Sequence, residues 1–174
     1  GDGLLLAQLI EHKECVGRGI EIDEQAVLAC IERDVPVYHG DMLEGMAFYR
    51  DDAFDVVILS QTLQQTSVPV CVIQHMLRVG QTAIISFPNF GHWRVRLQLL
   101  LRGRMPRTGL LPYAWFDTPN VHLCTIADFR ALCGRLGFDI VREIFLSPSF
   151  HQINGLLANW RAGSAIFQIR SVFP

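Results

Sequence analysis

Short apolar runs alternate with longer amphipathic segments along most of this chain. The most pronounced run is Phe54–Leu59, in which five of the six residues are apolar. Such a run is typical of a strand that is buried on both faces of a parallel sheet. Helical patterns lie between the runs, and parallel strands need such crossover connections. The alternation therefore predicts an α/β fold with a mostly parallel sheet, and it argues against an all-α or all-β fold.

The expected elements follow from apolar periodicity and from signals that begin and end helices. Asp23 is expected to cap one helix, Pro69 to lie in the first turn of another, and Thr125 to open a third with a capping box. Leu97, Leu100 and Leu101 are expected to form a packed stripe on a further helix. The expected helices cover residues 4–13, 23–33, 68–79, 93–101 and 125–136, and the expected strands cover 16–22, 35–39, 54–59, 82–87, 138–146 and 165–172. A long loop, 103–124, is of the kind that often binds ligands or covers a site.

Composition narrows the class of protein. Half of the 174 residues are hydrophobic, 18% are charged and the net charge is −2, which is typical of a globular chain and not of a disordered one. No apolar run approaches the roughly 20 residues that cross a bilayer, and no secretory signal is recognisable, so we expect no membrane span. The five cysteines lack metal-ligand spacing, so we expect reduced thiols in a cytoplasmic protein and no metal site.

Charge is divided unevenly along the chain. Residues 1–60 carry thirteen acidic and four basic side chains, whereas residues 61–174 carry four acidic and eleven basic ones. The division fits solvated faces, or a cationic ligand on the first part and an acidic partner near the second. Five arginines lie within residues 94–107, but no recognisable nucleic-acid module accompanies them, so we do not expect nucleic-acid binding. A solvated helix face and a docking face for an acidic protein both stay open.

Glycines and polar residues gather where ligands of open parallel sheets bind, at the carboxyl ends of the strands. A glycine turn before the first helix would let an anion approach the helix N-terminus. Glu21, at the end of the first expected strand, could accept both hydroxyls of a ribose. Asp41 follows the next strand and, with its apolar neighbour, could hold an adenine. The candidate cofactor-binding residues are Gly1, Gly3, Glu21, Ile22, Asp41, Met42, Ser60 and Gln61.

No catalytic residue is identified by these patterns. His92 follows the expected strand 82–87, and His122 and Tyr113 lie in the long loop. Either histidine could act as a base, and Tyr113 could shape an acceptor pocket. Polar loop residues more often serve structure, so both interpretations stay open.

Several longer stretches resemble one family. The most specific are Ser86–Arg94, which reads SFPNFGHWR, and Tyr113–Asn120, which reads YAWFDTPN. Further matching stretches are 19–23, 54–64, 76–80, 104–106 and 111–125. Together they resemble the methionine biosynthesis protein MetW family, within the class I S-adenosylmethionine-dependent methyltransferases. The likeness extends over nearly the whole chain to about residue 146.

The resemblance implies a Rossmann-like class I methyltransferase fold, with helices on both faces of a seven-stranded sheet of order 3-2-1-4-5-7-6. It implies a single methyltransferase-like domain over residues 1–174. The family pattern places a strand and further glycines before Gly1, so the first central strand is expected to be missing and the domain incomplete at its N-terminus. That strand would lie between the strands at 16–22 and 54–59.

The resemblance also implies S-adenosylmethionine or S-adenosylhomocysteine as the cofactor. Carried over by position, Gly1 and Gly3 would flank the methionine moiety, Glu21 would hold the ribose, Asp41 and Met42 would meet the adenine, and Ser60 and Gln61 would line the pocket floor. The family is associated with homoserine O-acetyltransferase, so a partner or activator of that enzyme is one expectation. An active methyltransferase on a small-molecule acceptor is the alternative, and the resemblance names no acceptor.

Overall fold

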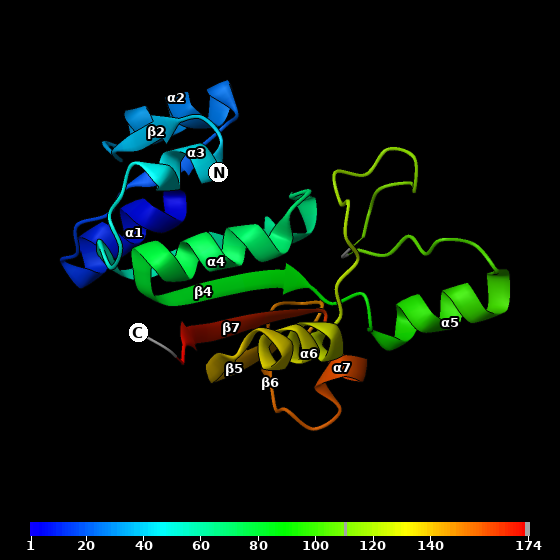
Figure 1. Ribbon diagram of the computed structural model, residues 1–174. Helices are drawn as coiled ribbons and strands as arrows, with labels where there is room; N and C mark the ends of the chain where they lie inside the picture. Colours follow the sequence, from blue (N-terminus) through cyan, green and yellow to red (C-terminus); the bar gives the residue numbers. More distant parts are fainter. Residues whose placement is uncertain (110, 173–174) are drawn as a thin grey trace. The chain divides into compact units, whose positions relative to one another are not determined.

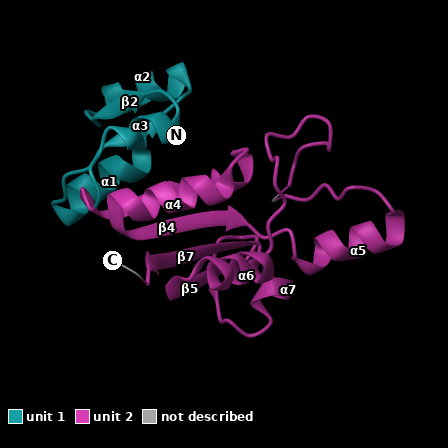
Figure 2. Cartoon of the chain, in the orientation of Figure 1, with its two compact units in different colours: residues 1–51 teal, residues 52–174 magenta. Residues whose placement is uncertain are grey.

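The structure, a computed structural model, describes residues 1–109 and 111–172. The chain divides into two compact units, residues 1–51 and 52–174 (Figure 2). Each unit has its own sheet. The single domain expected over residues 1–174 stays a prediction beside this division. No helix in the described part of the chain is long and apolar enough to cross a membrane.

The first unit is a small two-stranded α/β assembly. Its strands pair in parallel, with Glu21 opposite His39 at their carboxyl ends. Asp23 caps the second helix as predicted, since its Oδ1 accepts the Ala26 N–H at 2.8 Å. The third helix, which begins after Asp41, was not predicted. In order, the elements are α1 (Leu4–Lys13), β1 (Gly19–Glu21), α2 (Glu24–Glu32), β2 (Val37–His39) and α3 (Met42–Ala47) (Figure 1).

The second unit is built on a five-stranded sheet. Its elements are β3 (Phe54–Ser60), the 3-10 helix η1 (Leu63–Gln65), α4 (Pro69–Val79), β4 (Gly80–Pro88), α5 (Trp93–Arg102), α6 (Ile126–Leu136), β5 (Phe138–Leu146), β6 (Gln152–Ile153), α7 (Ala158–Arg161) and β7 (Ser164–Ser171). The strand order is β3-β4-β7-β5-β6. Only β3 and β4 pair in parallel, and the other neighbours are antiparallel. The sheet of this unit is therefore mixed, where a mostly parallel sheet was expected.

Strand order agrees with the expected methyltransferase sheet. The pair β2-β1 corresponds to the first two positions of 3-2-1-4-5-7-6, and β3-β4-β7-β5 corresponds to the last four. In the described residues β1 pairs only with β2, and β3 pairs only with β4. These are the two strands that would flank the expected first central strand, which stays a prediction.

The core of the second unit lies on one face of its sheet. Alternate residues of β4 and β7 are fully buried, namely Ala83, Ile85, Phe87, Ala165, Phe167 and Ile169. The ring of Phe129 from α6 packs on that face, with its centroid 5.0 Å from that of Phe87 and 4.7 Å from that of Phe167. On β3, Val56 and Ile58 stay 45% and 40% exposed. The expectation that 54–59 is buried on both faces is therefore wrong, because the face of β3 that carries Val56 and Ile58 is left partly uncovered.

A second prediction, the packed leucine stripe of helix α5, is also wrong. Leu97, Leu100 and Leu101 were expected to pack inward, but they are 43%, 81% and 73% exposed, respectively. Val95 is the buried residue of this helix. Figure 1 shows α5 extending away from the sheet of its unit. The described residues of the following loop, 103–109 and 111–124, contain no helix or strand beyond an isolated bridge between Thr108 and Leu111, so the predicted long loop is present.

Candidate cofactor site

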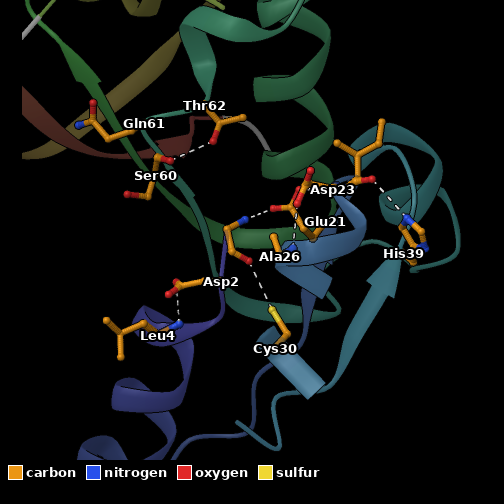
Figure 3. A network of polar contacts seen from close by, with 12 residues as sticks. Asp2, Leu4, Glu21, Asp23, Ala26, Cys30, His39, Ser60, Gln61 and Thr62 are labelled. Carbon is orange, nitrogen blue, oxygen red and sulfur yellow. Dashed lines mark hydrogen bonds and ion pairs between the residues drawn. The ribbon is translucent and has the colours of Figure 1, made fainter. Parts of the chain in front are cut away.

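The glycine turn at the start of the chain lies against α2. Gly3 has a φ of 77° and precedes the first residue of α1. A Cβ at this position would lie 2.9 Å from the Cys30 Sγ and 3.2 Å from its Cα, so only glycine fits both the backbone conformation and the space. The Cys30 thiol also lies 3.4 Å from the Gly1 carbonyl oxygen (Figure 3). The sequence therefore positions both predicted glycines at one end of this small sheet.

Glu21 at the end of β1 is firmly oriented. Its Oε1 accepts the N–H groups of Ile22 at 2.8 Å and Asp23 at 2.9 Å. Its Oε2 forms an ion pair with the α-amino group of Gly1, and the side chain is 15% exposed. The Ile22 side chain is largely exposed, and its carbonyl oxygen lies 3.2 Å from the His39 Nε2.

The carboxyl ends of β1 and β2 are tied together. The Gly40 N–H donates to the Glu21 carbonyl oxygen at 2.9 Å, so Asp41 follows directly beside the end of β1. Asp41 also caps α3, because its Oδ1 accepts the Leu43 N–H at 2.7 Å. Met42, half-buried, is the first residue of that helix. The structure thus brings the six candidate residues of the first unit to one edge of its sheet.

The other two candidates occupy the carboxyl edge of β3 in the second unit. Gln61 has a φ of 55°, a left-handed conformation that is strained for a side chain of this kind. Its N–H donates to the Ser86 carbonyl oxygen at 3.0 Å and also lies 3.1 Å from the Ser86 Oγ. The Ser60 Oγ lies 3.4 Å from the same hydroxyl. Both residues therefore lie at the predicted strand edge (Figure 3). That they complete one site with the first unit stays a prediction.

Gln64 is a polar residue of this edge that sequence reasoning missed. It is 6% exposed, and its carbonyl oxygen accepts the N–H groups of Val121 at 2.8 Å and His122 at 3.0 Å. Its Nε2 donates to the Gln61 carbonyl oxygen at 2.7 Å, while its Oε1 is buried with no hydrogen-bond partner in the described structure. The long loop is thus fastened to the end of β3. The matching stretch 54–64 includes this residue, but nothing in the sequence points to its bonds.

The three catalytic candidates lie in different surroundings. His92 is 3% exposed and caps α5, because its Nδ1 accepts the Arg94 N–H at 3.3 Å. Burial, and secondly the Arg94 guanidinium, lower the pKa of the His92 imidazole from its ordinary 6.5, so the ring is neutral at neutral pH. His122 and Tyr113 are exposed in the loop. Tyr113 lines a hollow of about 130 Å³ with Phe90 and other loop residues. A catalytic role for any of the three stays a prediction.

Among the described residues, no three histidine, cysteine, aspartate or glutamate side chains gather closely enough to hold an ion.

The fold is that of the class I methyltransferases. A solved SAM dependent methyltransferase from Archaeoglobus fulgidus superposes with a TM-score of 0.72 at 13% identity, covering 98% of this chain and 82% of the other. The [4+2]-cyclase SpnF superposes with a TM-score of 0.64 at 18% identity, covering 98% of this chain and 72% of the other. Identities this low establish the fold and leave the reaction open.

The sequence comparisons identify a particular family within this fold class. The family model described as methionine biosynthesis protein MetW matches residues 1–169, and this chain belongs to that family. A bifunctional methionine biosynthesis protein MetXA/MetW from Rhodopirellula baltica is 38% identical over 154 residues, which is 83% of this chain. The match covers 25% of that relative, so the chain spans about a quarter of its length.

Proposed function

We propose that this protein binds S-adenosylmethionine or S-adenosylhomocysteine and acts in methionine synthesis with a homoserine O-acetyltransferase, which it activates. The observation that carries the proposal is the relative that joins MetXA and MetW in one bifunctional protein. The cofactor is made from methionine, so its binding would report the supply of the pathway's product. An activator with different affinities for the enzyme in its free and cofactor-bound forms would provide feedback.

The donor and acceptor groups at the β1–β2 edge fit the proposed cofactor. Glu21 is acceptor-only and pre-oriented by two backbone N–H groups, as a carboxylate that binds ribose hydroxyls needs to be. Asp41 would accept the adenine amino group, with Met42 beside the ring. Gly1 and Gly3 would flank the methionine moiety, and Ser60 and Gln61 would contribute from the second unit.

The proposed partner surface comprises α5 and the loop 103–124, which we term the arm. Its exposed residues are of the kinds enriched at protein interfaces, aromatic side chains and arginines. Trp115 is 73% exposed and Phe116 is 76% exposed, and Leu100 and Leu101 of α5 are exposed to a similar extent. Residues 93–107 contain five arginines and no acidic residue. The arm therefore suits an apolar patch with an acidic rim on the acetyltransferase.

Cofactor binding is tested by calorimetric titration of the chain with S-adenosylmethionine. We expect Glu21→Gln to raise Kd about tenfold or more, because a charged acceptor for two hydroxyls becomes a neutral amide. Glu24→Gln, on the exposed start of α2, is the matched control and should leave Kd within about twofold. Equal Kd values for the wild type and Glu21→Gln would refute the assignment of the ribose site.

Activation is tested separately by measuring acetylation of homoserine by the acetyltransferase, with and without this protein. We expect stimulation that is lost when Leu100 and Leu101 are both changed to aspartate. Leu28→Asp, at a 55% exposed position on α2, is the matched control and should still stimulate. Cofactor binding with no effect on acetylation would exclude the activator role.

A second candidate function is methyl transfer to a small-molecule acceptor. The superposition on a SAM dependent methyltransferase favours it, because the fold can present a cofactor methyl group at this strand edge. An acceptor held in line would gain much of its rate from proximity. Incubation of the protein with S-adenosylmethionine and homoserine should then release S-adenosylhomocysteine faster than either component alone. A rate equal to the controls would exclude homoserine as the acceptor.

A further inference from the structure

A hollow of about 470 Å³ lies beyond the carboxyl end of β4, within the second unit. Three separate segments supply its walls: the start of α5, the turn between β5 and β6, and the end of α7. The lining residues are His92, Trp93, Arg94, Pro148, Ser149 and Arg161. None of them is acidic, and none belongs to the proposed cofactor site.

Two guanidinium groups face this hollow without compensating carboxylates. Among the described residues, neither Arg94 nor Arg161 forms an ion pair. The Arg94 guanidinium lies over the Trp93 ring, 5.3 Å from its centroid. The only polar side-chain contact described for Arg161 is long, at 3.5 Å from its Nη1 to the Asn154 Oδ1. Like charges that line one hollow repel each other unless an anion joins them.

His92 lines the same wall. Its Nδ1 accepts the Arg94 N–H, so the neutral ring carries its proton on Nε2. The ring is 3% exposed, so its orientation is set by packing. His92 is also the N-cap of the ten-residue helix α5, and Trp93 and Arg94 are its first two residues, so all three lie where the positive end of the helix dipole is.

The walls are held in place by hydrogen bonds from one buried residue. Asn89 donates from its Nδ2 to the Ala162 carbonyl oxygen at 2.8 Å, next to Arg161. Its Oδ1 accepts the Gly91 N–H at 3.0 Å, next to His92. The end of α7 and the start of α5 are therefore fixed relative to each other, and so are the backbone positions of Arg94 and Arg161.

We propose that this hollow is a binding site for a small-molecule oxyanion, a phosphate or a carboxylate, held by Arg94 and Arg161. Each guanidinium can donate two parallel hydrogen bonds to such a group. The volume exceeds that of the anionic group alone and lies in the range of small-molecule sites, so the ligand carries further atoms that would contact the Trp93 ring and Pro148. The site shares no residue with the proposed cofactor site and stands independently of it.

The test is a titration of the full chain with inorganic phosphate and, separately, with acetate, followed by ¹H–¹⁵N NMR at constant ionic strength set with sodium chloride. We expect one probe to shift the Trp93 and Arg94 signals in a saturable way. Arg94→Gln and Arg161→Gln should each raise its Kd about tenfold. Arg135→Gln, at the exposed end of α6, is the matched control.

The outcomes separate the two ligand classes from a chance association. Saturation by phosphate alone assigns a phosphate ligand, and saturation by acetate alone assigns a carboxylate ligand. Shifts that grow linearly with both probes, or a loss with Arg135→Gln as large as with Arg94→Gln, would overturn the proposal. The amide spectrum of each variant reports whether it is folded. A repeat on Glu21→Gln should give the wild-type Kd, since the cofactor site is not involved.

Discussion

Replacement of Asn89 by alanine should destabilise the second unit strongly. This side chain is 2% exposed and lies at the end of β4. Its Nδ2 donates to the carbonyl oxygens of Ala162 at 2.8 Å and Asn159 at 3.2 Å. Its Oδ1 accepts the N–H groups of Gly91 at 3.0 Å and Ile126 at 3.4 Å. One amide thus satisfies four backbone groups from three segments of the chain.

The size of the effect follows from those four contacts. A net hydrogen bond contributes about 0.5–1.5 kcal/mol, and a buried group left without a partner costs at least as much. With the two short bonds near the middle of that range and the two long ones near its lower end, we expect a loss of about 3 kcal/mol. Asn89→Asp keeps the shape but points an oxygen at two carbonyls, so it should cost at least as much.

Urea denaturation followed by far-ultraviolet circular dichroism measures the loss. With an m-value of about 2 kcal/mol/M, the midpoint should fall by about 1.5 M. Asn154→Ala, at an exposed position, is the control and should change stability by less than about 0.5 kcal/mol. A loss below about 1 kcal/mol for both Asn89 variants would refute the view that this residue holds the end of β4, α6 and α7 together.

Four further predictions concern individual residues. Ser164→Ala should stabilise the protein by about 1 kcal/mol in urea denaturation, because the buried Ser164 hydroxyl has no hydrogen-bond partner among the described residues. A destabilised variant would show that this hydroxyl does have a hydrogen-bond partner. Burial is the main cause that raises the pKa of Cys124 to about 12 and that of Cys133 to about 11. At pH 8, iodoacetamide should therefore modify the exposed Cys15 well before either of these thiols, and peptide mass spectrometry measures the order of modification. Because both values rise from 9.0 on folding, the stability that these thiols contribute is complete below pH 9 and is lost as pH rises through 11 and 12. Gly3→Ala should destabilise the first unit by about 1–2 kcal/mol, since alanine is strained at a φ of 77°; an unchanged thermal midpoint would contradict this.

Local signals in the sequence predicted most helix boundaries. Asp23 and Thr125 cap helices where expected, because caps depend on residues within a few positions of one another. Helix α1 has the predicted bounds. Helix α3 was missed, since six residues are too few to show a clear period.

Burial was harder to predict than secondary structure. The leucines of α5 have helical spacing, but spacing does not show whether another element covers them. The apolar run of β3 has the same ambiguity, because composition does not show whether another element covers each face of a strand. Both errors therefore arise from tertiary neighbours that a local pattern does not contain.

The positions of the candidate residues at strand ends could be predicted in part, whereas their role in a cofactor site stays a prediction. Glu21 and Asp41 lie at adjacent strand ends because parallel strands place their carboxyl ends at one edge. The capping bonds of Asp41 and His92 make them structural residues as well, which the strand-end pattern alone did not indicate. The contacts of the Gln64 carbonyl oxygen with Val121 and His122 could not be predicted, because they join segments more than fifty residues apart.

The carbonyl oxygen of Gln64 has a consequence for communication within the second unit. It accepts two N–H groups from the arm, while the Nε2 of the same residue donates to Gln61 at the strand edge. A molecule that displaces residues 121–122 on docking would disturb one residue that also supports the proposed cofactor pocket. Linkage then requires that cofactor binding and partner docking change each other's affinity by the same factor. Gln64 would then couple partner docking to cofactor binding.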